Sequence, residues 1–186
     1  NPLHMKMLEK YAMNNKFFYL LFFGVILALS RIIPHPPNFT PILASAIMAP
    51  MLIKDRWFGI AIPIVAMFIS DVIIGFYSYQ FVIYSSILAI ALVAPMRKNY
   101  VRLGIMAIGG SVWFFITTNF AEWMIWDYYP KTIEGLITCY TLAIPFFKNT
   151  LISTCLFTGL LTFSIKYLEV VNKKTNHLIS NLLARI

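Results

Sequence analysis

The chain has 186 residues, of which 60% are hydrophobic and only 12% are charged. A soluble domain has about a quarter of its residues charged, so this composition excludes an ordinary soluble protein and indicates an integral membrane protein. The formal net charge of +8 does not indicate nucleic-acid binding, because the basic residues lie in short clusters between apolar runs.

Six apolar runs are candidates for transmembrane helices, each of which needs about 20 mostly apolar residues. In chain order they cover residues 17–33, 41–53, 57–76, 80–96, 103–121 and 145–167. We therefore predict an all-α membrane protein, a bundle of six transmembrane helices over residues 17–167. Residues 1–4 resemble the remnant of a tag, and residues 5–16 are interpreted as a cytoplasmic N-terminus.

Two segments after the fifth run are predicted to lie at membrane surfaces. Residues 122–144 are interpreted as an outer interfacial segment, because aromatic side chains suit the headgroup region and Pro145 offers a natural helix break. Residues 168–186 are predicted to form an amphipathic basic helix on the inner leaflet. A docking surface for a cytoplasmic partner is the alternative for that helix.

The distribution of lysine and arginine predicts the orientation, because cytoplasmic flanks are enriched in both. With both termini inside, the inner segments hold twelve of the 15 basic residues, and the outer segments hold only Arg31, Lys131 and Lys148. We therefore expect both termini to be cytoplasmic and the proline-rich stretch 30–42 to lie on the outer side.

Polar side chains within or beside the runs are predicted to gather at the outer end. An ionisable residue inside a span is costly unless it is paired or wet, and a few polar groups in an apolar surround are typical of a small-molecule pocket. The predicted substrate-binding residues are Arg31, His35, Asn38, Asp71, Asn119, Glu122, Trp123, Lys148 and Asn149. The stretch 30–42 is interpreted as a stiff lid. The basic side chains favour an anionic group on the ligand.

Most of these residues also have a structural interpretation. Asp71 pairs with Arg31 or Lys148 to hold helices together, His35 is a solvated loop histidine, and Asn119 donates a hydrogen bond between helices. Glu122 belongs to an exposed acidic rim.

No catalytic or metal-binding motif is recognisable. The chain lacks H-E-x-x-H, G-x-S-x-G and a glycine-rich phosphate loop, so we expect neither an enzyme nor a cofactor. Cys139 and Cys155 have no metal-ligand spacing and are interpreted as small apolar packing residues.

Four strings carry a resemblance to a known group of proteins. They are RIIPHPPNFTPI, FISDVIIGFY, FFITTNFAEW and YYPKTIEGLITCYTLAIPFFKNTL. Together they resemble an uncharacterised family of small bacterial membrane proteins described as transport proteins, over nearly the whole chain after residue 17. That family is distantly similar to the S components of energy-coupling factor transporters, which are six-helix vitamin-binding subunits.

The resemblance implies vitamin-like micronutrient uptake through the bacterial inner membrane, with a ligand site at the outer face. It also implies a membrane coupling subunit and separate ATPases as partners. S components contact the coupling subunit through small residues of the first helix, where Gly24 and Ala28 form such a pair here. An accessory or assembly subunit of a membrane complex, and an ion-coupled carrier that uses Asp71, are the alternative functions.

Overall fold

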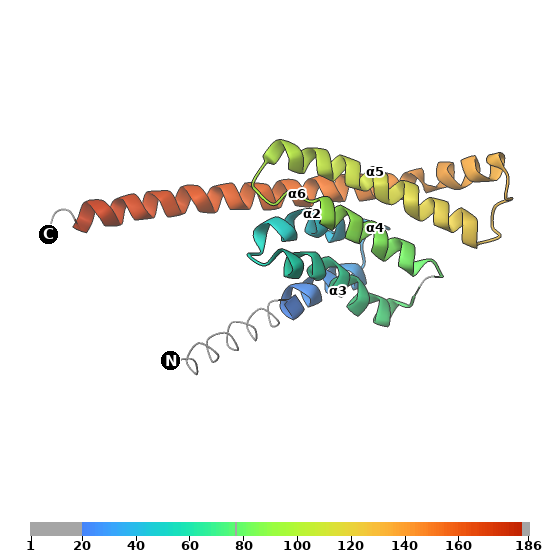
Figure 1. Cartoon of the computed structure of the whole chain (residues 1–186), viewed down its shortest axis with the longest axis horizontal. Helices are drawn as coiled ribbons and strands as arrows, with labels where there is room; N and C mark the ends of the chain where they lie inside the picture. Colours follow the sequence, from blue (N-terminus) through green and yellow to red (C-terminus); the bar gives the residue numbers. More distant parts are fainter. Residues whose placement is uncertain (1–19, 77, 184–186) are drawn as a thin grey trace.

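The computed structural model describes residues 20–76 and 78–183 of the chain, and side chains up to residue 175 with the exception of residue 172. Every regular element in these ranges is a helix, so the prediction of an all-α protein is confirmed. A first helix, Leu20–Ile32, precedes the five labelled helices (Figure 1). These are α2 Ile42–Leu52, α3 Arg56–Ile74, α4 Gln80–Val93, α5 Tyr100–Ile125 and α6 Ile133–Leu183. Residues 1–19 and 184–186 fall outside the described ranges, and with them the predicted tag remnant and N-terminus.

The prediction of six transmembrane helices is confirmed in part, for three helices of the described residues. Only α3, α5 and the part of α6 over Ile133–Thr175 are long and apolar enough to cross a membrane. Leu20–Ile32, α2 and α4 are shorter apolar helices. An 11-residue helix such as α2 rises only about 16 Å, roughly half the thickness of a bilayer's hydrocarbon core.

Helix α2 lies at the centre of the bundle, which explains why it can be short. Every residue from Ile42 to Pro50 is buried, and α2 packs against α3, α4, α5 and α6. Its Ile47 and Met48 form the core together with Ile87 of α4 and Leu103 of α5. A helix that is enclosed by other helices on all sides has no lipid-facing surface to match to the bilayer.

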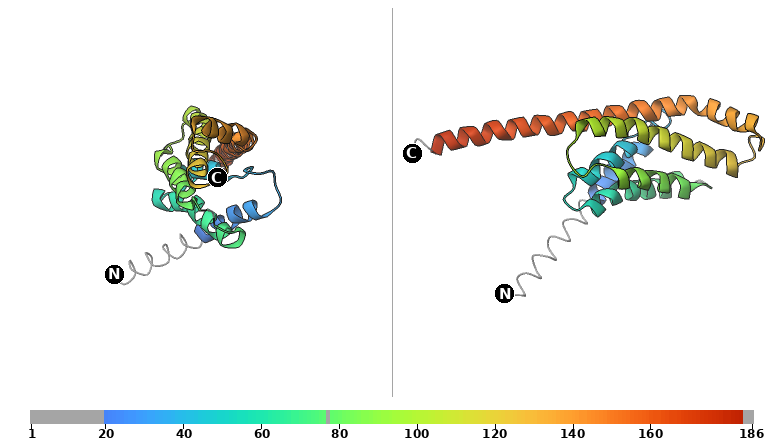
Figure 2. Two further views of the ribbon diagram at one scale, coloured as in Figure 1. Left: turned by 90° about the vertical axis from the view of Figure 1, so that its right-hand side faces the viewer. Right: turned by 45° about the horizontal axis from the view of Figure 1, so that its top comes forward.

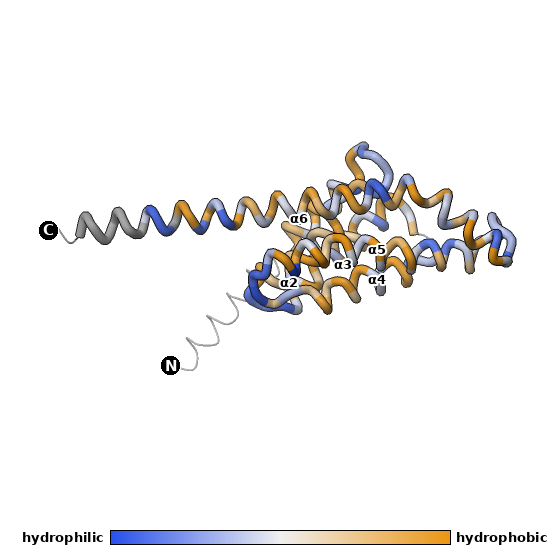
Figure 3. Tube along the Cα trace, turned by 90° about the horizontal axis from the view of Figure 1, so that it is seen from above, coloured by the Kyte–Doolittle hydropathy of each residue, from blue (hydrophilic) through white to orange (hydrophobic). Residues whose placement is uncertain are grey.

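The outer surfaces of the bundle are apolar. Large hydrophobic side chains stand exposed on the outward faces of the helices, for example Phe68, Phe81, Val101 and Ile137. Figure 3 shows hydrophobic residues along the bundle and hydrophilic ones at its ends and along the projecting part of α6. Exposed apolar surface on this scale is typical of contact with lipid.

The bundle has two distinct ends. The connections α3–α4 and α5–α6 lie at one, which we call the rim end (residues 75–79 and 126–132) (Figure 1). The connections α2–α3 and α4–α5 lie at the other, which we call the basic end (residues 53–55 and 94–99). The basic end is capped by side chains at two helix starts: Asp55 accepts a hydrogen bond from the Trp57 amide, and Asn99 accepts one from the Arg102 amide.

Helix α6 is a single helix of 51 residues and differs from its prediction at two places. It continues through Pro145, where a helix break was predicted, and residues 168–183 extend the same helix instead of forming a separate one. Residues 122–125 likewise belong to α5. Figure 2 shows α6 running far past the rest of the bundle.

Contacts on both sides of Pro145 explain why the helix does not break there. The ring of Phe115 in α5 packs against Tyr140 before the proline and against Phe147 after it, with centroid distances of 5.4 and 4.6 Å. The Tyr140 hydroxyl also donates to the Ile116 carbonyl. Proline inside a helix costs about 3 kcal/mol, and these tertiary contacts offset that cost.

Gly59 permits the closest helix crossing in the core, and a mutation tests it. A Cβ atom at this position would lie 2.5 Å from the Ala49 carbonyl oxygen of α2. We expect Gly59→Ala to lower the free energy of unfolding by about 2 kcal/mol, because backbone atoms must move apart. Thermal unfolding in detergent micelles measures the change.

Gly109→Ala is the matched control, since nothing lies within 4 Å of the added methyl group. It should leave the stability unchanged or raise it slightly through helix propensity. Equal losses in both variants would contradict the proposed close crossing.

Candidate functional site

A cavity of about 650 Å³ opens between the helices on the side of the rim end. All six helices and the loop of residues 33–41 contribute to its wall. The polar part of the wall comes from Arg31, His35, Asn38, Thr40, Thr118, Asn119, Glu122, Tyr129, Cys139, Thr150, Ser153 and Thr154. Apolar side chains of α2, α3 and α4, including Leu43, Met67 and Ile83, close the opposite side.

Helix α6 lines the cavity along one face. Its lining residues run from Cys139 through Ala143, Phe146 and Thr150 to Thr154, at the spacing of three or four residues that keeps side chains on one side of a helix. This face covers about 22 Å along the helix axis. The cavity is therefore elongated and follows α6 from the rim end into the bundle.

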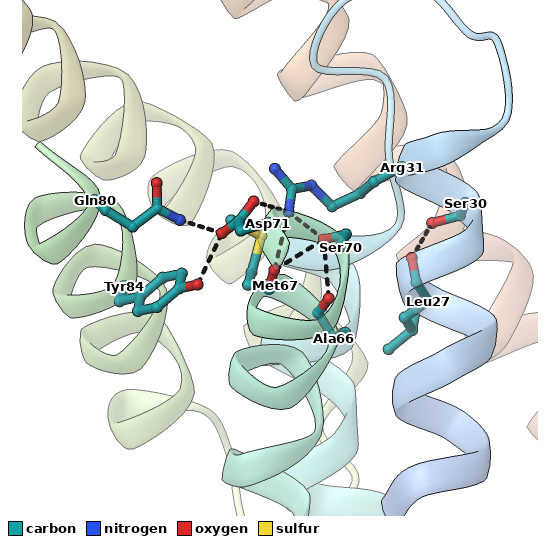
Figure 4. Close-up of polar contacts among 9 residues, drawn as sticks. All are labelled: Leu27, Ser30, Arg31, Ala66, Met67, Ser70, Asp71, Gln80 and Tyr84. Atoms are coloured by element: carbon teal, nitrogen blue, oxygen red, sulfur yellow. Dashed lines mark hydrogen bonds and ion pairs between the residues drawn. The ribbon is translucent and has the colours of Figure 1, made fainter. Parts of the chain in front are cut away.

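Asp71 lies behind the cavity wall in a network of hydrogen bonds and is fully buried. One of its oxygens accepts from the Arg31 guanidinium at 2.6 Å, and the other accepts from the Tyr84 hydroxyl at 2.8 Å and from the Gln80 amide. Figure 4 shows Arg31 of the first helix and Tyr84 and Gln80 of α4 converging on Asp71 of α3. The structural interpretation of Asp71 as a buried ion pair with Arg31 is thus the one that the geometry supports.

Arg31 belongs both to this network and to the cavity wall. Its Nη1 atom also donates to the Met67 carbonyl and to the Ser70 hydroxyl. The second terminal nitrogen points away from Asp71 (Figure 4), and Arg31 lines the cavity. The charge of the guanidinium is therefore balanced by Asp71, while part of its donor capacity is left for the cavity.

The loop of residues 33–41 is held against α6 by contacts spaced one turn apart. The Asn149 side-chain amide donates to the Pro37 carbonyl at 3.0 Å, Ser153 donates to the Asn38 carbonyl at 3.5 Å, and Phe39 packs edge-on against Phe157. Asn38 has a positive φ of 63°, which asparagine tolerates better than most residues. Asn149 is thus an anchor of the loop and is not part of the cavity wall.

Three further predicted residues lie in or near the cavity with different surroundings. His35 lines it and its Nδ1 contacts the Ile33 carbonyl at 2.6 Å. Asn119 lines it, and its side-chain amide donates to the Phe115 carbonyl one turn earlier in the same helix, which differs from the predicted bond between helices. Glu122 also lines the cavity and is half-buried. Within residues 20–76 and 78–183 its carboxylate makes no hydrogen bond or ion pair.

Trp123 and Lys148 are not part of the cavity wall. The Trp123 indole donates to the Pro130 carbonyl at 2.9 Å and so holds the α5–α6 connection. Lys131 supports the same connection by donating to the carbonyls of Trp123 and Trp126, where a cation at a helix C-terminus is favourable. Lys148 is exposed on α6.

Gly24 and Ala28 are buried within the chain itself. A Cβ atom on Gly24 would lie 3.1 Å from Val65 of α3, and Ala28 is 1% exposed. Gly24 thus packs the first helix against α3, and Ala28 is buried one turn later. In this arrangement neither of them offers a surface to the predicted coupling subunit.

Sequence reasoning missed the hydroxyl side chains of α6 and Tyr129. Thr154 is fully buried, lines the cavity and has no hydrogen-bond partner within the described part of the chain. Burial raises the pKa of Tyr129, and the negative charge of the nearby Glu122 adds to the effect. Its hydroxyl therefore stays protonated at neutral pH. The spacing of Thr150, Ser153 and Thr154 within an apolar run was the available signal.

The fold and the site together define an all-helical, membrane-type protein with an elongated polar cavity beneath a docked loop. The particular group follows from the family comparison: the model of DUF6580, a family of unknown function, matches residues 11–177. The chain belongs to this family. No curated protein and no solved structure matches it.

Asp71→Asn tests the structural role of the buried pair. The substitution leaves the half-buried Arg31 without its counter-ion, and breaking a buried ion pair on one side costs about 3 kcal/mol or more. We expect a loss of this size in the free energy of unfolding, measured by denaturant titration in mixed micelles.

Asp127→Asn is the control, because Asp127 is 99% exposed and lies 3.6 Å from Lys131. Such a surface pair contributes less than about 1 kcal/mol. If Asp71→Asn lowered the free energy of unfolding as little as this control does, the network would not hold the three helices together.

Proposed function

We propose that this chain is an integral membrane protein that binds a small, vitamin-like molecule in the cavity and takes part in its uptake. The observation that supports this most is the cavity itself. Its volume of about 650 Å³ falls within the range of about 300–1,000 Å³ typical of small-molecule sites. A subunit with a purely structural role would pair its polar groups and leave no such space.

The topology assigned to this function follows the distribution of basic residues. We place the rim end outside and the basic end, with both termini, in the cytoplasm of a bacterial inner membrane. The docked loop of residues 33–41 then lies over the outer part of the cavity. The distant resemblance to energy-coupling factor S components agrees with this proposal, including separate coupling and ATPase subunits as partners.

The charges around the cavity favour a ligand that differs from the anion expected from sequence. Lys148 is outside the wall, and the charge of Arg31 is balanced by Asp71. Glu122 is the carboxylate that lines the cavity without an ion pair in the described ranges. We therefore propose a ligand with a hydrogen-bond-donating or cationic group near Glu122 and a largely apolar or aromatic body along α6.

Thr154 supports ligand binding independently of charge. A buried hydroxyl without a hydrogen bond costs about 1–3 kcal/mol, so this position lowers the stability of the free protein. A ligand atom that bonds to the hydroxyl removes that cost on binding. A polar group that lacks a hydrogen bond in the ligand-free protein and gains one in the complex is typical of a binding site.

An accessory or assembly subunit is the second candidate. It is favoured by α6, whose 51 residues rise about 76 Å, far more than the bilayer core of about 30 Å. The projecting part offers surface to another protein. The ion-coupled carrier has less support, because both oxygens of Asp71 are occupied and the carboxylate is fully buried.

Thr154→Val tests the binding proposal in two measurements. The variant removes the buried hydroxyl at nearly constant shape, so we expect the ligand-free protein to become about 1 kcal/mol more stable. Native mass spectrometry of gently solubilised protein should show that the wild type retains a small molecule, and that the variant retains about tenfold less of it, because one buried hydrogen bond is lost.

Thr150→Val is the matched control in the same wall. Its hydroxyl donates to the Phe146 carbonyl at 3.0 Å and is therefore satisfied without a ligand. The free energy of unfolding of the Thr150→Val variant should therefore differ little from that of the wild type. Detection of lipid alone in the wild type, together with no stabilisation by a panel of vitamins, would instead support the accessory subunit.

A further inference from the structure

A second hollow, separate from the cavity, lies between α5 and α6 on the side of the basic end. This groove has a volume of about 420 Å³. Its floor is formed by the buried residues Leu103, Ala107 and Thr158, and its sides by the exposed Ile108 and Phe163. Apart from a few polar positions the walls are apolar.

Two glycines keep the groove open. Gly104 of α5 and Gly159 of α6 both line it, and nothing lies within 4 Å of the position that a Cβ atom would take on either residue. They therefore do not serve a close helix contact, unlike Gly59. Larger side chains at these positions would fill the groove.

Thr158 is a polar residue of the groove whose hydroxyl has no hydrogen-bond partner among the described residues. The residue is 4% exposed, and its hydroxyl has no hydrogen bond within the described part of the chain. Most threonines of α6 donate to the carbonyl one turn earlier, as Thr150 does. Thr158 is therefore a buried polar residue beside the groove whose hydroxyl lacks the usual bond along the helix.

The end of the groove nearest the C-terminus carries a positive charge. Lys166 lines the groove, and its Nζ lies 4.0 Å from the centre of the Tyr100 ring. No carboxylate pairs with Lys166 among the described residues. The neighbouring Lys98, by contrast, is paired with Glu169, whose hydrogen bond raises the pKa of the lysine. Lys166 is thus held at the mouth by a cation–π contact and is available to an anion.

We propose that this groove binds one anionic phospholipid, with its phosphate at Lys166 and Tyr100 and an acyl chain along Gly104, Gly159 and Thr158. Basic sites between membrane helices are suited to anionic headgroups.

The length of the groove favours a lipid over a partner helix. From Lys166 to Cys155 the groove follows 11 residues of α6, which corresponds to about 16 Å. One leaflet of the hydrocarbon core is about 15 Å thick, so a lipid headgroup at Lys166 places its acyl chain along the whole groove. A transmembrane partner helix would extend over twice that length.

The test uses the full chain in nanodiscs of dioleoylphosphatidylcholine, with and without dioleoylphosphatidylglycerol. We expect the wild type to unfold at a higher temperature with phosphatidylglycerol and to retain one molecule of it in native mass spectrometry. Lys166→Gln should lower the retained phosphatidylglycerol about fivefold, the effect of one basic residue at a membrane surface. Gly159→Leu should abolish retention by filling the groove, without unfolding the protein.

Lys174→Gln controls for general attraction to an anionic surface, because Lys174 is exposed on the same helix and lies outside the groove. This variant should retain the lipid as the wild type does. Equal losses for Lys174→Gln and Lys166→Gln would overturn the proposal, as would equal stabilisation in pure phosphatidylcholine. A dimer in phosphatidylcholine discs that Gly159→Leu disrupts would overturn it as well, in favour of a second copy of the chain in the groove.

Discussion

The arrangement of the first helix, α3 and α4 depends on the burial of one carboxylate. Asp71 is fully buried, and an ionised carboxylate away from water is stable only when paired and hydrogen-bonded. Arg31 brings the end of the first helix to α3, while Tyr84 and Gln80 bring the start of α4 to the same point. Because the loop of residues 33–41 begins directly after the first helix, this pair also determines where the loop starts to cross the cavity.

The two hollows are lined by consecutive stretches of α6. The cavity ends near Thr154 and the groove includes Thr158, one turn further along. The hydroxyls of both lack a partner within the described residues. Two unsatisfied hydroxyls at neighbouring turns of one helix are a local cost to stability.

Several features were predictable because they depend on composition along the chain. The positions of the apolar runs located α2, α3, α4 and α5, and the end of the first helix, to within a few residues. The gathering of Arg31, His35, Asn38, Asn119 and Glu122 around one space was also anticipated from their places near the predicted outer ends. The roles of the individual side chains were less accessible, since Asn149 holds the loop and Trp123 holds the α5–α6 connection.

The sequence by itself determined that the chain is helical and apolar, because hydrophobic runs and the positions of charged residues are local properties. Only the tertiary structure decided how long each helix is and which polar groups are satisfied. Pro145 stays within a helix because Phe115 packs against residues on both sides of it. Helix α2 can be short because other helices enclose it. Thr154 and Thr150 are the same residue type on the same helix. Among the described residues, the hydroxyl of Thr154 has no hydrogen-bond partner, whereas that of Thr150 is bonded. That difference arises from packing between segments distant in the chain, which a local pattern does not encode.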